Sequence, residues 1–249
     1  MQKISPQTEA RLSAGVQKFQ PILRRAQLAG RNESDTVMII TDILCEVFGY
    51  DKYENITSEL CIKQQFCDLA VQLNGKVRLL LECKAVSVAL RDVHVSQATG
   101  YAASAGIDWV VLTNGITWRI YQVLFGKPVE TVLVCEFNFC ELNVNRPEDY
   151  APLYALSVEA FQEEGNAALS QLYAQRRVLN RFIVGQVLLN DWMIGTIRRS
   201  LERHYPGVKM DDGEVRRIDT AFQKIGYQLI PQTQKMWYQS APHNKTVCI

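Results

Sequence analysis

Two neighbouring stretches of alternating apolar and polar residues, 61–73 and 77–85, limit most strongly what this chain can fold into. Alternation with a period of two is typical of β-strands that bury one face, and Asn74-Gly75 is a common turn sequence. The apolar positions of both stretches are odd-numbered, so their apolar faces coincide only if the numbers of paired residues sum to an even value. We therefore predict a hairpin with a three-residue loop and Gly75 in the left-handed conformation.

The second strand, LLLECKA at 79–85, carries two charged residues, Glu82 and Lys84, within an otherwise apolar run. A buried charge without a partner is costly, so these side chains need a compensating group. In the predicted hairpin Asp68 lies on the same face, opposite Leu80 or Glu82. Two carboxylates and one ammonium group are therefore expected to converge on this face of the sheet.

A divalent cation is the usual compensation for two neighbouring carboxylates such as Asp68 and Glu82, because it binds oxygen ligands and keeps positions for water and substrate. The backbone carbonyl of Cys83 is a candidate third ligand. Lys84 would then lie near the attacking water or a phosphate and offset the charge that develops during an in-line displacement. This pattern is typical of a phosphodiesterase that uses Mg²⁺ or Mn²⁺.

Helical patterns surround the hairpin, and the order helix, hairpin, helix, hairpin predicts an α/β sheet layered by helices. The predicted elements are a helix over 7–28, a second helix from the N-cap Asn32 to Gly49, a helix over 91–104 that Gly106 closes, and a second hairpin over 108–123 with Asn114-Gly115 at its turn.

Three polar residues on these helices are further candidates. Glu33 begins the second helix on its apolar stripe, and it is either an acid directed at the sheet or a first-turn acid that the helix dipole favours. Gln97 and Tyr101 lie one turn apart on the helix over 91–104, among small residues that permit close packing.

The net charge of +1 conceals an asymmetry along the chain. From residue 165 onward there are twelve Lys or Arg and six Asp or Glu, a net charge of +6, whereas the first 164 residues hold 15 Lys or Arg and 20 Asp or Glu, a net charge of −5. The basic part either faces an anionic partner or is a set of solvated helix faces. We predict two domains, an α/β domain over 1–150 and a mainly helical region over 151–249, with helices at 166–190, 191–204 and 212–224.

Composition narrows the class of protein. No run of about 18 apolar residues appears, and the polar N-terminus lacks the pattern of a signal peptide, so we expect a cytoplasmic protein without a membrane partner. The seven cysteines form no CxxC pair, which favours reduced core thiols over structural zinc.

The candidate residues, taken together and in order, resemble the PD-(D/E)XK nuclease superfamily: Glu33, Asp68, Glu82-Cys83-Lys84 and Gln97-x-x-x-Tyr101. Over residues 30–125 the chain is similar to the N-terminal nuclease domain of type I restriction enzyme R subunits. The segments that carry this similarity are VFGYDKYENITSEL, CDLAVQL, LLLECKA, QATGYA and VVLTNGITWRIYQV. Cys67 stands where the superfamily motif has its proline, a position that varies within the superfamily.

The resemblance implies a restriction-endonuclease-like mixed sheet flanked by helices, and Mg²⁺-dependent endonuclease cleavage of DNA. It implies a role for each candidate: metal ligands Asp68 and Glu82, catalytic lysine Lys84, accessory acid Glu33, and Gln97 and Tyr101 near the substrate. It points to double-stranded DNA, whereas the residues by themselves leave RNA and single strands open.

The R subunits continue into an ATP-driven motor, but this sequence contains no GxxxxGK[ST] phosphate-binding loop. Double-strand cleavage by a single metal site would favour a homodimer, and separate motor or methyltransferase subunits are further candidate partners. The alternative function is a non-catalytic nucleic-acid-binding or assembly module that keeps the nuclease fold. The presence of all four polar residues, Glu33, Asp68, Glu82 and Lys84, favours the enzyme, because Asp68 and Glu82 would repel the phosphates of a ligand that is only bound.

Overall fold

The structure is a computed structural model that describes residues 4–62, 65–162, 167–178, 183–184, 187 and 190–207. The chain divides into two compact units, residues 1–173 and 174–249.

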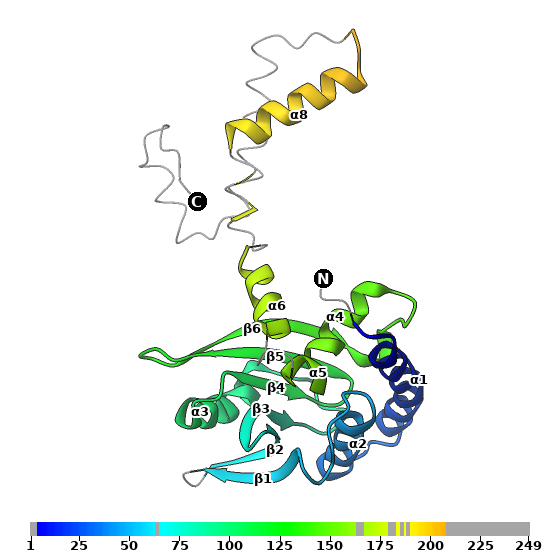
Figure 1. Cartoon of the computed structure of the whole chain (residues 1–249), viewed down its shortest axis with the longest axis vertical. Helices are drawn as coiled ribbons and strands as arrows, with labels where there is room; N and C mark the ends of the chain where they lie inside the picture. The colour runs from blue at the N-terminus through cyan, green and yellow to red at the C-terminus, as the bar shows by residue number, and fades with distance from the viewer. Residues whose placement is uncertain are drawn as a thin grey trace. The chain divides into compact units, whose positions relative to one another are not determined.

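A six-stranded mixed sheet forms the centre of the first unit (Figure 1). Its strands lie side by side in chain order: β1 (Ile56–Ile62), β2 (Gln65–Leu73), β3 (Lys76–Cys83), β4 (Trp109–Thr113), β5 (Thr117–Leu124) and β6 (Glu130–Asn138). Neighbouring strands are antiparallel except β3 and β4, which are parallel and connected through helix α3 (Val95–Ala105). The predicted mixed α/β sheet flanked by helices is confirmed.

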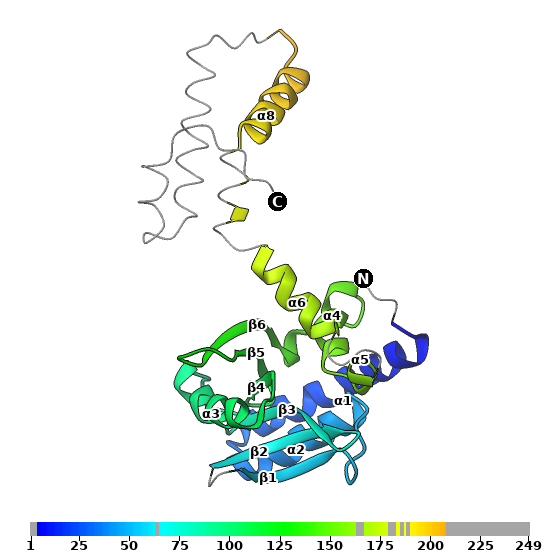
Figure 2. The same cartoon turned by 60° about the vertical axis from the view of Figure 1, so that its left-hand side comes forward.

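Helices cover both faces of the sheet (Figure 2). Helices α1 (Pro6–Leu28) and α2 (Glu33–Glu46) pack in one hydrophobic core with the odd-numbered residues of β3, such as Leu79 and Leu81. Helix α3 packs in a second core on the other face, where Leu80 and Val110 lie. Because alternate strand residues enter different cores, both faces of β3 are buried and its sequence is almost continuously apolar.

The N-terminal helices and the crossover helix follow the predictions closely. Asn32 is the N-cap of α2, where its side chain accepts a hydrogen bond from the backbone N–H of Asp35. Helix α3 ends at Gly106, which has a positive φ of 70° that a residue with a side chain rarely adopts.

The predicted strand over 61–73 was wrong, because this segment belongs to two strands. Cys61 and Ile62 end β1, and Gln65 begins β2 and pairs with Ile62. The sequence IKQQF contains no Gly, Pro, Asn or Asp that would indicate a reversal.

The three-residue loop predicted between β2 and β3 was also wrong. The predicted pairing is correct from Val71 back to Leu69, where the numbers of paired residues sum to an even value. The loop is the two-residue turn Asn74-Gly75, with φ values of 53° and 71°. An irregularity between Val71 and Gln72 shifts the register by one residue, so that Leu69 pairs with Leu81. This bulge restores the parity that a two-residue turn alone would have broken.

The C-terminal part of the first unit was only partly predicted. Strand β6 was missed because its residues lie at the sheet edge, where most of them are partly or fully exposed and the alternation is weak. Helices α4 (Pro147–Ala155) and α5 (Val158–Gln162) contribute Leu153, Tyr154 and Phe161 to the main core. The first unit therefore extends beyond residue 150, where we predicted the domain boundary.

The remaining described helices are α6 (Ala167–Val178) and α8 (Asp191–His204). The predicted helix over 191–204 is confirmed, and α6 accounts for the first half of the helix predicted over 166–190. The helix predicted over 212–224 lies outside the described residues. None of the described helices is both long enough and apolar enough to cross a membrane.

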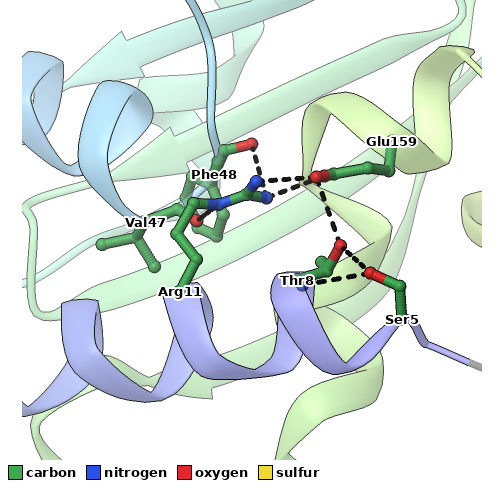
Figure 3. A network of polar contacts seen from close by, with 6 residues as sticks. All are labelled: Ser5, Thr8, Arg11, Val47, Phe48 and Glu159. Carbon is green, nitrogen blue, oxygen red and sulfur yellow. Dashed lines mark hydrogen bonds and ion pairs between the residues drawn. The ribbon is translucent and has the colours of Figure 1, made fainter.

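A polar network around Arg11 connects α1 to α5 and to the end of α2 (Figure 3). The guanidinium donates to both carboxylate oxygens of Glu159, at 2.6 and 2.7 Å, and its Nε donates to the carbonyl of Val47 at 3.0 Å. Burial raises the pKa of Glu159, but the hydrogen bonds and charge of Arg11 outweigh burial, and the pKa lies below its ordinary value of 4.5. The pair therefore stabilises the fold in its ionised form.

We predict that Arg11→Met lowers the free energy of unfolding at pH 7 by about 2 kcal/mol, because it removes charge-assisted hydrogen bonds from a partly buried carboxylate. Because the folded pKa of Glu159 is lowered, its contribution is present above pH 4.5 and is lost as the pH falls through the folded value. Urea unfolding at pH 7 and pH 3 measures both effects. Arg25→Met, at an exposed position on the same helix, is the control, and an equal loss at both pH values would contradict this account.

Candidate active site

The candidate residues of the hairpin meet where β3 ends. The register of β2 and β3 pairs Leu69 with Leu81, so Asp68 follows opposite Glu82, which is one of the two positions predicted for it. One carboxylate oxygen of Asp68, Oδ2, accepts a hydrogen bond of 2.6 Å from the backbone N–H of Cys83. This bond fixes Asp68 against the end of β3 and leaves its second oxygen, Oδ1, for another partner.

Lys84 is the cation of the site and lies among oxygen atoms. Its Nζ donates to Glu82 Oε1 at 2.7 Å and to the carbonyl oxygen of Cys83 at 2.8 Å, and it lies 3.7 Å from Glu33 Oε2. The side chain of Glu82 is 7% exposed, whereas that of Glu33 is 50% exposed. The structure therefore brings together Glu33, Asp68, Glu82 and Lys84, and supports the reading of Glu33 as an acid directed at the site.

The backbone around Lys84 is held by neighbouring elements. The N–H of Lys84 donates to the carbonyl of Thr113 at 2.8 Å, which continues the contact between β3 and β4 by one residue. Two residues later, the N–H of Val86 donates to Thr36 Oγ1 in the first turn of α2. The Asn114 side chain, in the turn after β4, donates to the carbonyl of Val88 at 2.9 Å. These bonds fix the segment after β3 to the start of α2, from which Glu33 projects.

Thr36 and Asn114 are positioning residues that sequence reasoning missed. Both are buried, with exposed fractions of 0% and 7%. Thr36 lies at helical spacing from the apolar residues Ile40 and Ile43, whereas Asn114 lies in a turn, and a buried polar group needs a hydrogen-bond partner. That signal was present in the sequence, but Asn114 was interpreted only as a turn residue.

The electrostatics of the site show an excess of negative charge. Burial raises the pKa of Glu82, the hydrogen bond from Lys84 lowers it, and the charges of Asp68 and Glu33 raise it; the net pKa lies above its ordinary value of 4.5. Burial lowers the pKa of Lys84, but Glu82 and Glu33 outweigh burial and raise it above 10.5. The ammonium form of Lys84 is thus strongly favoured, and one cation faces three carboxyl groups.

The donor atoms present fit a hard divalent cation. The free oxygen of Asp68, the carboxylate of Glu82 and the carbonyl of Cys83 are all oxygen ligands of the kind that Mg²⁺ prefers. The Lys84 ammonium already contacts two of these donors, which shows that they face a common cation. Across the described part of the chain, no three Asp, Glu, His or Cys side chains converge in a way that could hold a metal ion, so this set depends on a backbone carbonyl.

The two candidates on α3 do not join this cluster in the same way. Tyr101 is fully buried in the core between α3 and the sheet, so any effect of this side chain on a substrate would be indirect. Gln97 lies one turn earlier in α3, and its side chain is outside the described part of the structure.

Comparison with known families addresses the segment that carries this site. Residues 38–131 match the family model described as the type I restriction enzyme R protein N terminus (HSDR_N). The site-bearing segment resembles restriction enzyme R proteins. The match confirms the resemblance expected from the motifs, and it includes Asp68, Glu82 and Lys84 but not Glu33. No curated protein and no solved structure gave a significant match.

We predict that Glu82→Gln raises the melting temperature of the metal-free protein at pH 8, and raises it less at pH 5. The pKa of Glu82 is higher in the folded protein than in the unfolded chain. The free energy of unfolding therefore falls as the pH rises from the unfolded pKa through the folded pKa. Above both pKa values the ionised carboxylate destabilises the fold by the full amount. Glutamine keeps an oxygen acceptor for Lys84 but removes the charge. Differential scanning fluorimetry in EDTA measures the shifts.

The matched control is Glu136→Gln, which removes a carboxylate that pairs with Arg119 at the sheet edge. It should leave the melting temperature unchanged or slightly lower at both pH values. A lower melting temperature of Glu82→Gln at pH 8 would contradict the excess of negative charge at the site.

Proposed function

We propose that the first unit is a Mg²⁺-dependent endonuclease domain that hydrolyses phosphodiester bonds of DNA. The observation that carries the proposal is the convergence of Asp68, Glu82, the carbonyl of Cys83 and Lys84 at the end of β3. Its support is that this cluster lies within the segment that resembles the restriction enzyme R protein N terminus. Mn²⁺ is an alternative metal, because it accepts the same oxygen ligands.

The bound metal ion would supply Lewis-acid polarisation of a phosphate oxygen and a water molecule of lowered pKa. The residues of this chain have separate tasks around it. Asp68 and Glu82 would bind the ion and balance its charge, and the hydrogen bond from the Cys83 N–H to Asp68 fixes one of these carboxylates in advance. Such prior orientation reduces the reorganisation needed when substrate enters.

Lys84 orients the reacting groups. Its ammonium has three N–H donors, of which two are directed at Glu82 and at the carbonyl of Cys83. The third, together with any donor that a bound metal ion displaces from these oxygens, can bind a phosphate oxygen or the attacking water, where the positive charge offsets the negative charge of the transition state. Glu33, half exposed and 3.7 Å from Nζ, is placed to hold Lys84 in this orientation or to accept a proton at the open side of the site.

A non-catalytic nucleic-acid-binding or assembly module that keeps the nuclease fold is the alternative function. It would have no use for two carboxylates held beside the phosphates of its ligand, since both would repel them. We therefore favour the enzyme, with DNA as its substrate. A homodimer and separate motor or methyltransferase subunits stay predictions about its partners.

We predict that the wild-type protein nicks or linearises supercoiled plasmid in Mg²⁺ or Mn²⁺ but not in EDTA, and that Asp68→Asn lowers the rate at least about 100-fold. Asparagine keeps an acceptor for the N–H of Cys83 but removes the charge that binds metal, so the fold should persist. Lys84→Ala should lower the rate similarly by removing the ammonium. Gel electrophoresis of the plasmid measures the rates, and circular dichroism checks folding.

Two controls make the same substitutions, Asp to Asn and Lys to Ala, at surface positions. Asp42→Asn and Lys52→Ala remove the partners of an exposed ion pair on another part of the first unit, and both should cleave at the wild-type rate. Cleavage that persists in EDTA, or that Asp68→Asn leaves unchanged, would contradict the proposed function.

A further inference from the structure

The charge of the two units presents a physical problem for a DNA-cleaving enzyme. Residues 165–173 carry no charged side chain, so the first unit has a net charge of −5 and the second unit, residues 174–249, has a net charge of +6. DNA affinity comes largely from basic groups that neutralise phosphates. The unit that carries the candidate active site therefore lacks net attraction for DNA, whereas the second unit has it.

Helix α8 is the described element of the second unit in which basic side chains are ordered on one face. Helical spacing places Trp192, Arg199 and Arg203 together, and places Ile197 and Leu201 on the opposite face. Trp192 is 67% exposed, and Arg199 and Arg203 are also exposed. Ile197 and Leu201 are partly buried. The basic face is therefore the face that α8 presents to solvent.

The arginines of this face are available for an anionic ligand. Among the ion pairs between described residues, none involves an arginine of α8. Within the described residues, Arg199 donates a hydrogen bond of 3.1 Å to Thr196 Oγ1 on the same face, which directs its guanidinium along the helix surface. A guanidinium without a carboxylate partner keeps several donors for phosphate oxygens.

The position of the tryptophan distinguishes between two anionic partners. A helix that lies on a membrane has its aromatic residues on the apolar face, which enters the lipid. In α8 the indole of Trp192 is instead on the face of Arg199 and Arg203, opposite the apolar residues. Aromatic and basic side chains on one surface are typical of nucleic-acid binding, where the ring packs on a base or sugar beside phosphate contacts.

We propose that the face of α8 formed by Trp192, Arg199 and Arg203 binds the phosphate backbone of DNA and supplies affinity that the acidic first unit lacks. This inference rests on the proposed function for its choice of DNA as the ligand. It assigns substrate binding and phosphodiester hydrolysis to different units of the chain.

The experiment measures binding of a fluorescently labelled DNA duplex to the full chain in EDTA, by anisotropy, over a series of KCl concentrations. Each phosphate contact contributes about 0.9 to the slope of log K against log salt. The double variant Arg199→Gln/Arg203→Gln should therefore reduce the slope by about 2 and weaken binding about 60-fold at about 0.1 M KCl. Trp192→Ala should weaken binding without a change in slope, because the indole releases no counterion.

The matched control is Arg24→Gln/Arg25→Gln, which removes two exposed arginines from α1 in the first unit and should bind as the wild type does. The inference is overturned if the α8 double variant keeps the wild-type affinity and slope. It is also overturned if the wild type binds vesicles of phosphatidylserine and phosphatidylcholine through Trp192 and does not bind DNA.

The failures of the two proposals are distinguishable. Metal-dependent nicking by a wild type whose DNA binding is unchanged by the α8 substitutions would overturn this inference alone. DNA binding that depends on α8, without nicking by the wild type in Mg²⁺, would overturn the proposed hydrolysis and support the role of α8.

Discussion

The contact between Lys84 and Glu82 is the interaction on which the account of this protein depends. Glu82 is almost fully buried at the end of β3, and a buried carboxylate requires a nearby cation. Lys84 supplies that cation two residues later, at the point where the chain leaves the strand and its side chain reaches back over the carbonyl of Cys83. The pair leaves the site with surplus negative charge, because Asp68 and Glu33 face the same ammonium. That surplus is the physical reason to expect a divalent cation.

The fold brings the residues of this cluster together from distant parts of the sequence. A register-shifting irregularity after Val71 places Asp68 opposite Glu82, and the N-cap of α2 begins the helix from which Glu33 reaches Lys84. The parallel pairing of β3 with β4 places the turn after β4 beside the segment that follows Lys84. Asp68 and Lys84 each form a hydrogen bond with the backbone of Cys83, and Glu82 and Glu33 contact the ammonium of Lys84, so these contacts position the side chains before any ligand binds.

Much of the site could be predicted from the sequence because strand alternation fixes the side of the sheet on which each residue lies. The parity of the apolar positions was sufficient to place Asp68 on the same face as Glu82. The predicted loop was wrong, but a bulge and a two-residue turn give the same parity as a longer loop. The reversal before Gln65 was missed because the sequence IKQQF contains no strong turn residue, and the edge strand β6 was missed because most of its residues are partly or fully exposed and its alternation is weak. The role of Glu33 was left open by the sequence because it depends on a tertiary distance that no local pattern encodes.

The most direct test of the central claim, that the cluster at the end of β3 is a metal site, is a crystal structure of the protein grown with Mn²⁺ and measured for anomalous scattering. The account predicts an anomalous peak in contact with the carboxylates of Asp68 and Glu82 and the carbonyl of Cys83, with Lys84 displaced from at least one of these oxygens. A well-ordered site with no peak, and with Lys84 still bound to Glu82 and Cys83, would contradict it.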